Sequence, residues 1–266
     1  MSSIENVIAS NREAWNASAS QHRASEAWTT LIAAVDRADF SCLDATLTGL
    51  LEQVDLRGKD VVQLGCNNGR ESLSLFSLGA RSVVGVDQSS AFLEQAHELS
   101  ARSPHAPAFV EADIHALPAS LNARFDVALI TIGVLNWMPD MQAFFAHVAS
   151  TLKPGGVLVI YETHPFLEML EPGAADPWRI SGSYFQTEPV VEDKAIVYVG
   201  EGEANGVTSY WHIHRLSDIV GGVLRAGLQL RDFTEYPHSN REDLYDVYEE
   251  GGVQVPMCYT LVAVKG

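Results

Sequence analysis

The most constraining feature of this 266-residue chain is the segment 60–87, DVVQLGCNNGRESLSLFSLGARSVVGVD. An apolar run stops at a glycine-containing turn, residues 65–69, and a helical pattern follows. A second apolar run, residues 83–86, ends on Asp87. This order predicts a strand, a turn, a helix and a second strand with a carboxylate at its carboxyl end, which is half of a nucleotide-binding α/β sheet. In such a sheet the turn approaches the ligand, and the acid accepts hydrogen bonds from ribose hydroxyls.

The spacing of the glycines narrows the choice of ligand. A dinucleotide site needs the pattern G-x-G-x-x-G, because the pyrophosphate lies against the start of the helix. Here Asn67 and Arg70 stand at the second and third glycine positions. The turn therefore favours a ligand that carries adenosine without a diphosphate.

Four segments of the chain resemble the class I S-adenosylmethionine-dependent methyltransferases. The turn is similar to the first motif of that family. Residues 109–114 (FVEADI), 125–130 (FDVALI) and 152–160 (LKPGGVLVI) are similar to its third, fourth and fifth strands. The four motifs occur in the family's order and cover about residues 55–162.

The resemblance implies S-adenosylmethionine as the cofactor, with Asp87 on the ribose and Asp113 at the adenine. In small-molecule members, an aromatic residue or a histidine in an amino-terminal lid closes on the donor, which points to Trp15 and His22; a plain amphipathic helix is the alternative. The expected cofactor contacts are Trp15, His22, Gly65, Cys66, Asn67, Asn68, Asp87, Gln88, Asp113, Ile114 and Thr131.

Two positions depart from the family pattern. The family usually has an acid where this chain has Gln63, and the middle glycine of the turn is replaced by Asn67. Asparagine tolerates a left-handed backbone, and the amide oxygen of Gln63 can still accept a hydrogen bond. These departures leave open a protein that binds the donor without catalysing transfer.

Hydrophobic patterning predicts a Rossmann-like α/β fold with a seven-stranded, mostly parallel sheet and an antiparallel last strand. We expect an N-terminal helical lid over residues 1–55 and a methyltransferase domain over residues 56–266. A β-rich insertion over residues 165–213 is expected to cover the substrate. The expected strands are 60–64, 82–86, 107–111, 125–130, 156–162, 228–234 and 257–264, with insertion strands at 183–186, 195–199 and 207–213, and the expected helices are 69–78, 89–101, 140–151 and 215–226.

The catalytic residues are less visible than the donor site. Methyl transfer from a sulfonium needs alignment and desolvation of the nucleophile, and a base only where the nucleophile keeps its proton until reaction. His164 follows the fifth expected strand and His214 ends the insertion, so both are candidate bases, and His164 is preferred because the strand anchors it. A structural hydrogen bond is the alternative for each. The expected substrate contacts are Asn136, Trp137, Tyr184, Trp211 and His212.

A metal site is not expected. His212 and His214 lie two residues apart, so on a strand they share a face and could be two ligands, but no third ligand is apparent.

Composition restricts the partners and the compartment. Thirty-four acidic and 17 basic residues give a formal net charge of −17, so a nucleic acid would be repelled. No run of about 18 apolar residues occurs, so we expect no membrane span. The three cysteines are far apart, which suits a reducing cytoplasm.

The expectation is a cytoplasmic enzyme that methylates an oxygen or nitrogen of a small neutral or cationic molecule. A protein-directed methyltransferase and a non-catalytic donor-binding protein are the alternatives.

Overall fold

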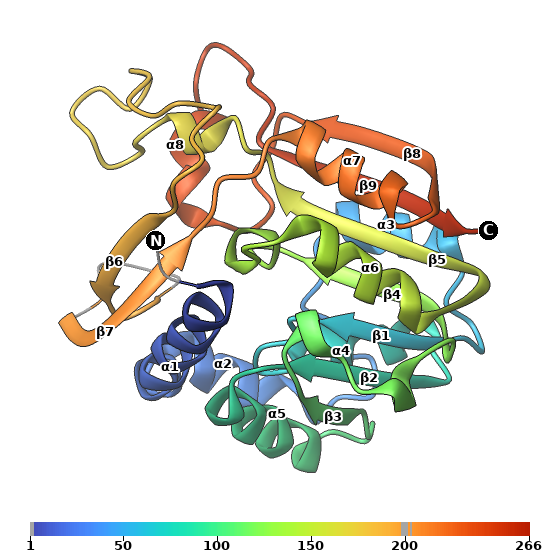
Figure 1. Ribbon diagram of the computed structural model, residues 1–266. Coiled ribbons are helices and arrows are strands. Elements are labelled where there is room, and N and C mark those ends of the chain that lie inside the picture. Colours follow the sequence, from blue (N-terminus) through green and yellow to red (C-terminus); the bar gives the residue numbers. More distant parts are fainter. Residues whose placement is uncertain (1–2, 198–201, 203) are drawn as a thin grey trace.

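The centre of the molecule is a seven-stranded sheet in the order β3-β2-β1-β4-β5-β9-β8 (Figure 1). The computed structural model describes residues 3–197, 202 and 204–266. The strands are β1 (Asp60–Leu64), β2 (Ser82–Asp87), β3 (Ala108–Glu111), β4 (Phe125–Thr131), β5 (Leu152–Thr163), β8 (Leu228–Tyr236) and β9 (Cys258–Lys265). Strands β1 to β5 pair in parallel, and β9 runs antiparallel to both β5 and β8. The predicted Rossmann-like fold is confirmed.

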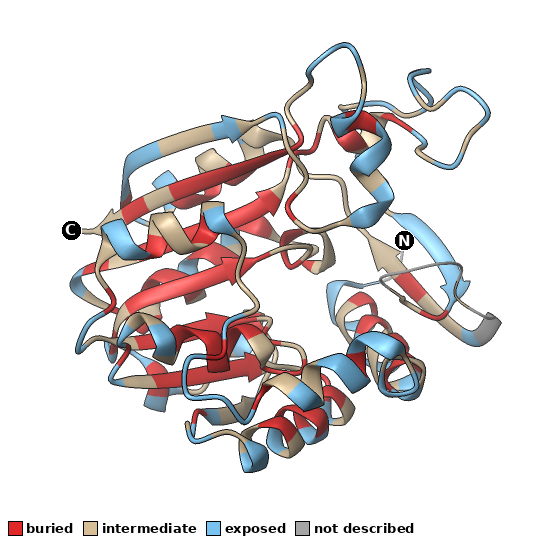
Figure 2. Cartoon of the chain, turned by 180° about the vertical axis from the view of Figure 1, so that it is seen from behind, coloured by how far each residue is buried: buried red, intermediate tan, exposed pale blue. Residues whose placement is uncertain are grey.

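The central strands are buried on both faces, as their continuous apolar runs predict. Figure 2 shows the middle of the sheet in the colour of buried residues. Val62 and Ala128 pack on one face, whereas Val61 and Leu129 pack on the other. Because successive side chains of a strand alternate between faces, both faces need a helical cover.

Helices cover both faces of the sheet. The first face carries α6 (Met141–Thr151) and α7 (Leu216–Arg225). The second face carries α3 (Ala45–Val54), α4 (Arg70–Ser74) with a following 3₁₀ turn (Leu75–Leu78), and α5 (Ser90–Arg102). Asp44, Ser89 and Asp140 begin α3, α5 and α6 by accepting hydrogen bonds from backbone N–H groups of the first turn.

The three helices before the sheet take different positions. Helix α3 packs into the core of the sheet, and α2 (Glu26–Ala34) packs against α4 and α5 through Leu73 and Leu99. Helix α1 (Ile4–Arg23) instead lies beside β7 (Figure 1). Within the described residues, every helix is too short or too polar to cross a bilayer.

The insertion after β5 contains one two-stranded antiparallel sheet, formed by β6 (Val190–Lys194) and β7 (Ala204–Trp211). The strand expected at 207–213 is confirmed for residues 207–211, which belong to β7, whereas 212–213 are not in a strand. The strand expected at 183–186 is wrong, because the side chain and carbonyl of Ser183 accept hydrogen bonds from the next residues and form a turn. At 195–199, residues 195–197 are not a strand, and 198–199 lie outside the described residues.

Strand β6 was not predicted because all five of its residues are exposed, so no alternation of apolar and polar residues marks it. The remaining helix, α8 (Asp246–Glu249), lies in the long segment between β8 and β9.

The contact between α6 and α7 gives a matched test of the packing. A Cβ on Gly222 would lie 2.5 Å from the Phe145 ring, whereas a Cβ on Gly221 would meet only the flexible end of Arg225. We expect Gly222→Ala to lower the free energy of unfolding by about 1–3 kcal/mol, because the core is already close-packed. Gly221→Ala should leave it unchanged or raise it by up to about 1 kcal/mol, since alanine favours helix. Urea denaturation of both variants measures this, and equal effects would contradict the packing.

Candidate functional site

The turn after β1 adopts the left-handed backbone that its sequence demands. Gly65, Asn67 and Gly69 have φ angles of 71°, 49° and 74°. The amide oxygen of Asn67 accepts a hydrogen bond from the backbone N–H of Asn68 at 2.8 Å. A Cβ on Gly65 would lie 2.6 Å from a methyl group of Val134, so this position excludes larger residues. Asn67 therefore replaces the middle glycine without loss of the turn.

Asp87, at the tip of β2, fastens the turn. Its carboxylate accepts a hydrogen bond from the backbone N–H of Asn67 at 2.7 Å and from that of Ser89 at 2.9 Å. Burial raises the pKa of this carboxyl, and the backbone donors oppose that effect. Each carboxylate oxygen can accept a further bond, so the group remains able to receive ribose hydroxyls.

The side chain of Gln63 makes hydrogen bonds within the protein. Its side chain is buried, its amide oxygen accepts a hydrogen bond from the Ser72 hydroxyl at 2.5 Å, and its amide nitrogen donates to the Thr131 hydroxyl at 3.4 Å. The amide thus joins β1, α4 and β4. The departure from an acid at this position is explained by a neutral network inside the domain.

The other expected donor contacts lie at the same edge of the sheet. The side-chain oxygen of Gln88 is buried and has no hydrogen-bond partner among the described residues, which fits a group that awaits a ligand. Asp113 follows β3 and accepts hydrogen bonds from the backbone and the ring of His115, while Ile114 is buried. The Cys66 side chain packs in the core, where burial raises the pKa of its thiol, so only its backbone can face a ligand.

A cover lies over this edge, built from α1 and the β6–β7 sheet. Asn11 is fully buried, donates to the Tyr210 carbonyl at 3.0 Å and accepts from the Tyr210 N–H at 2.7 Å. Asn16 accepts from the hydroxyl of Ser89 at 2.7 Å, which ties the cover to the residue after Asp87 and Gln88. His22 is hydrogen-bonded through Nε2 to the Ile196 carbonyl at 2.6 Å.

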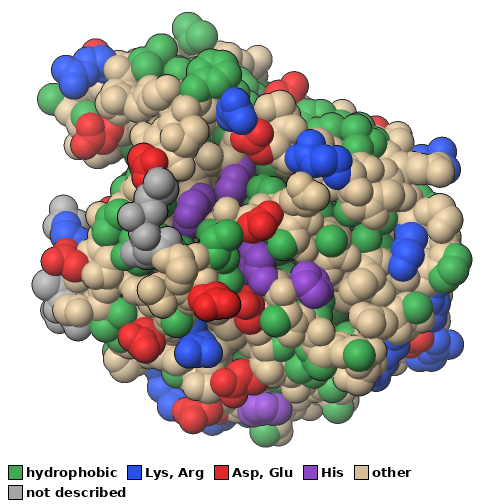
Figure 3. All heavy atoms as spheres, in the orientation of Figure 1, with side chains coloured by type: hydrophobic (Ala, Val, Ile, Leu, Met, Phe, Trp, Pro, Cys, Tyr) green, Lys and Arg blue, Asp and Glu red, His purple; other side chains and the backbone are tan. Residues whose placement is uncertain are grey.

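Aromatic rings line the inner side of the cover. The ring of Trp15 lies 5.4 Å from that of Phe92 and 5.3 Å from that of Trp137, and Trp137 lies 5.0 Å from Trp211, all edge to face. Trp15, Trp137 and Trp211, which were expected to be site residues from separate segments, therefore come together. Histidine side chains gather in the middle of the face seen in Figure 3, between β7 and α6.

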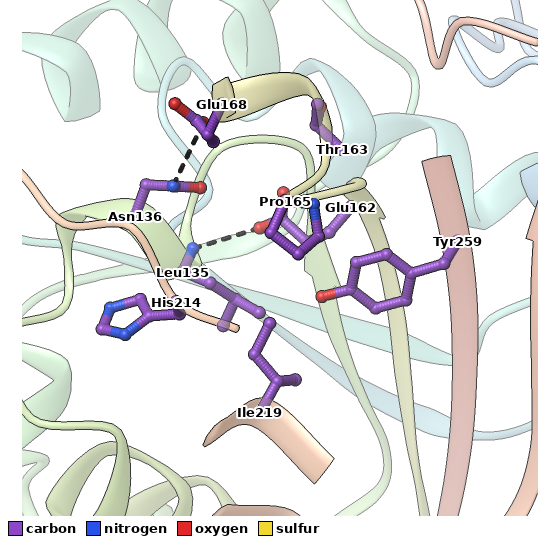
Figure 4. Close-up of a pocket in the computed structure, with 9 residues that line it drawn as sticks. All are labelled: Leu135, Asn136, Glu162, Thr163, Pro165, Glu168, His214, Ile219 and Tyr259. Carbon is purple, nitrogen blue, oxygen red and sulfur yellow. Dashed lines mark hydrogen bonds between the residues drawn. The ribbon is translucent and has the colours of Figure 1, made fainter. Parts of the chain in front are cut away.

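A small pocket opens beside these rings, at the carboxyl ends of β4 and β5 (Figure 4). Its walls include the expected residues Asn136 and His214. They also include Glu162, Glu168 and Tyr259, which sequence reasoning missed. Glu162 could have been found as a polar residue at the end of the fifth apolar run. No local sequence pattern distinguishes Glu168 or Tyr259.

The two pocket carboxyls are held differently. Glu162 is buried and accepts hydrogen bonds from the backbone N–H groups of Gly133 at 2.6 Å and Leu135 at 3.1 Å. Burial raises its pKa to about 8. Glu168 accepts from the indole N–H of Trp211 at 3.1 Å, and burial raises its pKa to about 7.

The preferred catalytic candidate, His164, lies apart from this pocket's lining. Its Nδ1 accepts from the Phe166 N–H at 3.0 Å, so Nε2 carries the proton and donates to Glu235 at 3.0 Å. Neither ring nitrogen is left to accept a proton, which speaks against a role as base. The physical reason is the turn at Pro165, which directs the ring toward β8.

The insertion histidines and Tyr184 also make structural contacts. Nε2 of His214 donates to the Met138 carbonyl at 2.8 Å. The backbone of His212 pairs with Asn136, and its ring stacks 6.0 Å from that of His214. The Tyr184 hydroxyl accepts from the N–H of Leu216 at the start of α7. In the described part of the chain, no group of three or more His, Cys, Asp or Glu side chains could hold a metal ion.

Comparison with known proteins agrees with this geometry. A family model described as "Methyltransferase domain" matches residues 61–156. The ubiquinone biosynthesis O-methyltransferase of Coxiella burnetii is 26% identical over 209 residues, 79% of this chain and 80% of that one. The tRNA U34 carboxymethyltransferase of Alteromonas mediterranea is 30% identical over 112 residues, 40% of this chain and 32% of that one.

A solved S-adenosylmethionine-dependent methyltransferase from Mesorhizobium loti shares the fold. Its TM-score is 0.56 at 20% identity, over 83% of this chain and 98% of that one. Residues 61–156 therefore form a methyltransferase domain, in a chain with the fold of the class I S-adenosylmethionine-dependent methyltransferases. S-adenosylmethionine is its cofactor.

For a methyltransferase of this class, Asp87 gives a direct test of the donor site. We expect Asp87→Asn to weaken binding of S-adenosylmethionine by about 1–3 kcal/mol, because a charge-assisted hydrogen bond to the ribose is lost. Asp232→Asn, at an exposed position on β8, is the matched control. Isothermal calorimetry measures both, and equal affinities for the two variants would contradict the assignment.

Glu168 gives a test by pH. The unfolded pKa of glutamate is near 4.3, so the folded methyltransferase holds an extra proton between pH 4.3 and about 7. The free energy of unfolding of the wild type, relative to Glu168→Gln, should therefore fall by about 1–3 kcal/mol as pH rises through this window and stay level above it. Urea denaturation across the range measures the difference. A difference that does not change with pH would contradict the raised pKa.

Proposed function

We propose that this methyltransferase transfers the methyl group of S-adenosylmethionine to an oxygen or a nitrogen of a small molecule in the cytoplasm. The observation that carries the proposal is the cover. Helix α1 and β7 close over the carboxyl ends of the strands, where Trp15 and Trp211 contact Trp137 of the loop after β4, next to a small pocket. A covered site with aromatic side chains nearby suits a small acceptor, because ligand sites bury most of a small ligand's surface.

In this proposal the adenosine end of the donor lies along the ends of β2 and β3. Asp87 and Gln88 bind the ribose, and Asp113 and Ile114 contact the adenine. The turn of residues 65–69 and Thr131 lie against the remaining part of the donor. Trp15 and His22 close over it from the cover.

The chain contributes alignment and exclusion of water. Bound S-adenosylmethionine supplies a methyl group on a positively charged sulfur, which is activated for displacement. Trp15, Trp137 and Trp211 keep water from the site, so the acceptor loses its hydration on entry. Asn136 and His212 hold the end of β7 against the loop after β4, which orients the acceptor.

The charge of the chain supports a small acceptor over a nucleic acid. The net charge of −17 opposes binding to a polyanion. The similarity to a tRNA-modifying enzyme covers 40% of this chain and 32% of that protein, so it does not carry that enzyme's acceptor over to this chain.

Formation of S-adenosylhomocysteine tests the proposed function. The protein is incubated with S-adenosylmethionine and, separately, with a small-molecule metabolite extract, a protein extract and total tRNA. We expect sustained turnover with the small-molecule extract alone, and about tenfold or more slower turnover with Asp87→Asn at limiting donor. Turnover with tRNA or protein alone would identify a macromolecular acceptor. Donor binding without any turnover would favour a non-catalytic protein.

A further inference from the structure

Three carboxyl groups without a cationic partner in the described part of the chain gather at the pocket at the ends of β4 and β5. Glu162 and Glu168 line it, and Glu242 lies beside it, where it accepts a hydrogen bond from the Thr163 hydroxyl at 2.9 Å. None of the three forms an ion pair with a lysine or arginine of the described residues. Buried carboxylates are normally paired with a cation, because an isolated buried charge is costly. Among the described residues, the pocket thus lacks the cation that would stabilise the ionised form of these carboxyls.

The histidine in the pocket wall does not supply the missing charge. Burial lowers the pKa of His214, and its Nε2 proton is donated to the Met138 carbonyl. The neutral ring leaves the carboxyls uncompensated. Burial also raises the pKa values of Glu162 and Glu168 to about 8 and about 7, as expected for carboxyls without a cation.

A second, independent feature points to a ligand. Tyr259 is fully buried, and its hydroxyl has no hydrogen-bond partner among the described residues. Figure 4 shows this hydroxyl directed into the pocket, beside Glu162. The two residues are direct cross-strand neighbours on β9 and β5, so the register of the sheet fixes their proximity. A buried hydroxyl without a partner is unfavourable unless a bound group satisfies it.

We propose that this pocket binds the protonated amino group of the acceptor, so that the substrates are small amines. This inference rests on the proposed function and names the substrate class of the same site. An ammonium group presents three donors, which match the two carboxylates and the Tyr259 oxygen. The pocket is small, so it takes the amino group while the rest of the substrate lies against the neighbouring tryptophans. A carboxylate or phosphate group would find no lysine or arginine among the residues that line the pocket.

The test uses ethylammonium chloride as the probe, compared with ethanol, sodium acetate and potassium chloride at equal ionic strength. The full chain is saturated with S-adenosylhomocysteine. The indole N–H of Trp211 donates to Glu168, so its NMR signal, assigned with Trp211→Phe, reports on the pocket. We expect ethylammonium to shift this signal saturably and the other three solutes to leave it in place.

Three variants locate the binding. Glu168→Gln keeps an acceptor for Trp211 and removes the charge, and Tyr259→Phe removes only the hydroxyl. We expect each variant to weaken ethylammonium binding about tenfold. The Trp211 signal measures binding in Tyr259→Phe, and ligand-detected NMR measures it in both variants. Glu192→Gln, on the exposed strand β6, should bind like the wild type. Circular dichroism checks that the variants are folded.

Two outcomes would overturn the inference. One is the lack of a saturable shift with ethylammonium, or an equal shift with potassium chloride. The other is unchanged affinity in both Glu168→Gln and Tyr259→Phe. Calorimetry with S-adenosylmethionine on the same samples separates the two proposals. Donor binding together with either outcome removes the amine pocket and leaves the proposed function intact, whereas absent donor binding counts against the proposed function.

Discussion

The two backbone hydrogen bonds that Glu162 accepts connect the turn after β1 with the pocket at the ends of β4 and β5. They hold Gly133 and Leu135, the residues on either side of Val134. Val134 in turn packs so closely on Gly65 that no side chain would fit there. One buried carboxyl on β5 therefore positions the loop after β4 and, through it, the turn after β1. The same carboxyl forms a wall of the pocket, so the distance between that turn and the pocket depends on it.

The cover is joined to the domain at both ends of the site. Asn16 reaches Ser89 on the donor side, while the backbone of His212 pairs with Asn136 on the acceptor side. Between these points α1 and β7 are bonded to each other through Asn11. Edge-to-face contacts of Trp15 with Phe92 and Trp137 add to these hydrogen bonds. Opening of the cover requires both kinds of contact to break.

The sequence predicted most of the fold because the central strands carry continuous apolar runs and the helices carry regular periodicity. The positions of Asp87 and Asp113 at the ends of β2 and β3 could be predicted equally well, since each follows a recognisable strand. The pocket could not be predicted in the same way. Tyr259 is brought to Glu162 by the pairing of β5 with β9, and no local pattern encodes that register. His164 looked functional from its place after β5, but the direction of its ring depends on the turn at Pro165 and on Glu235 of β8.

Asn11 pairs with a residue 199 positions later in the chain, so α1 leaves the ribosome long before its partner exists. Strand β9 is made later still, yet it lies between β5 and β8 in the finished sheet. During synthesis the donor turn and its neighbouring strands are thus complete while the cover is unattached and one edge of β5 is bare. An unpaired strand edge invites pairing with other chains. The growing polypeptide is therefore most exposed to aggregation until β9 has been made, and the pairing of β9 with β5 and β8 is the step that completes the sheet.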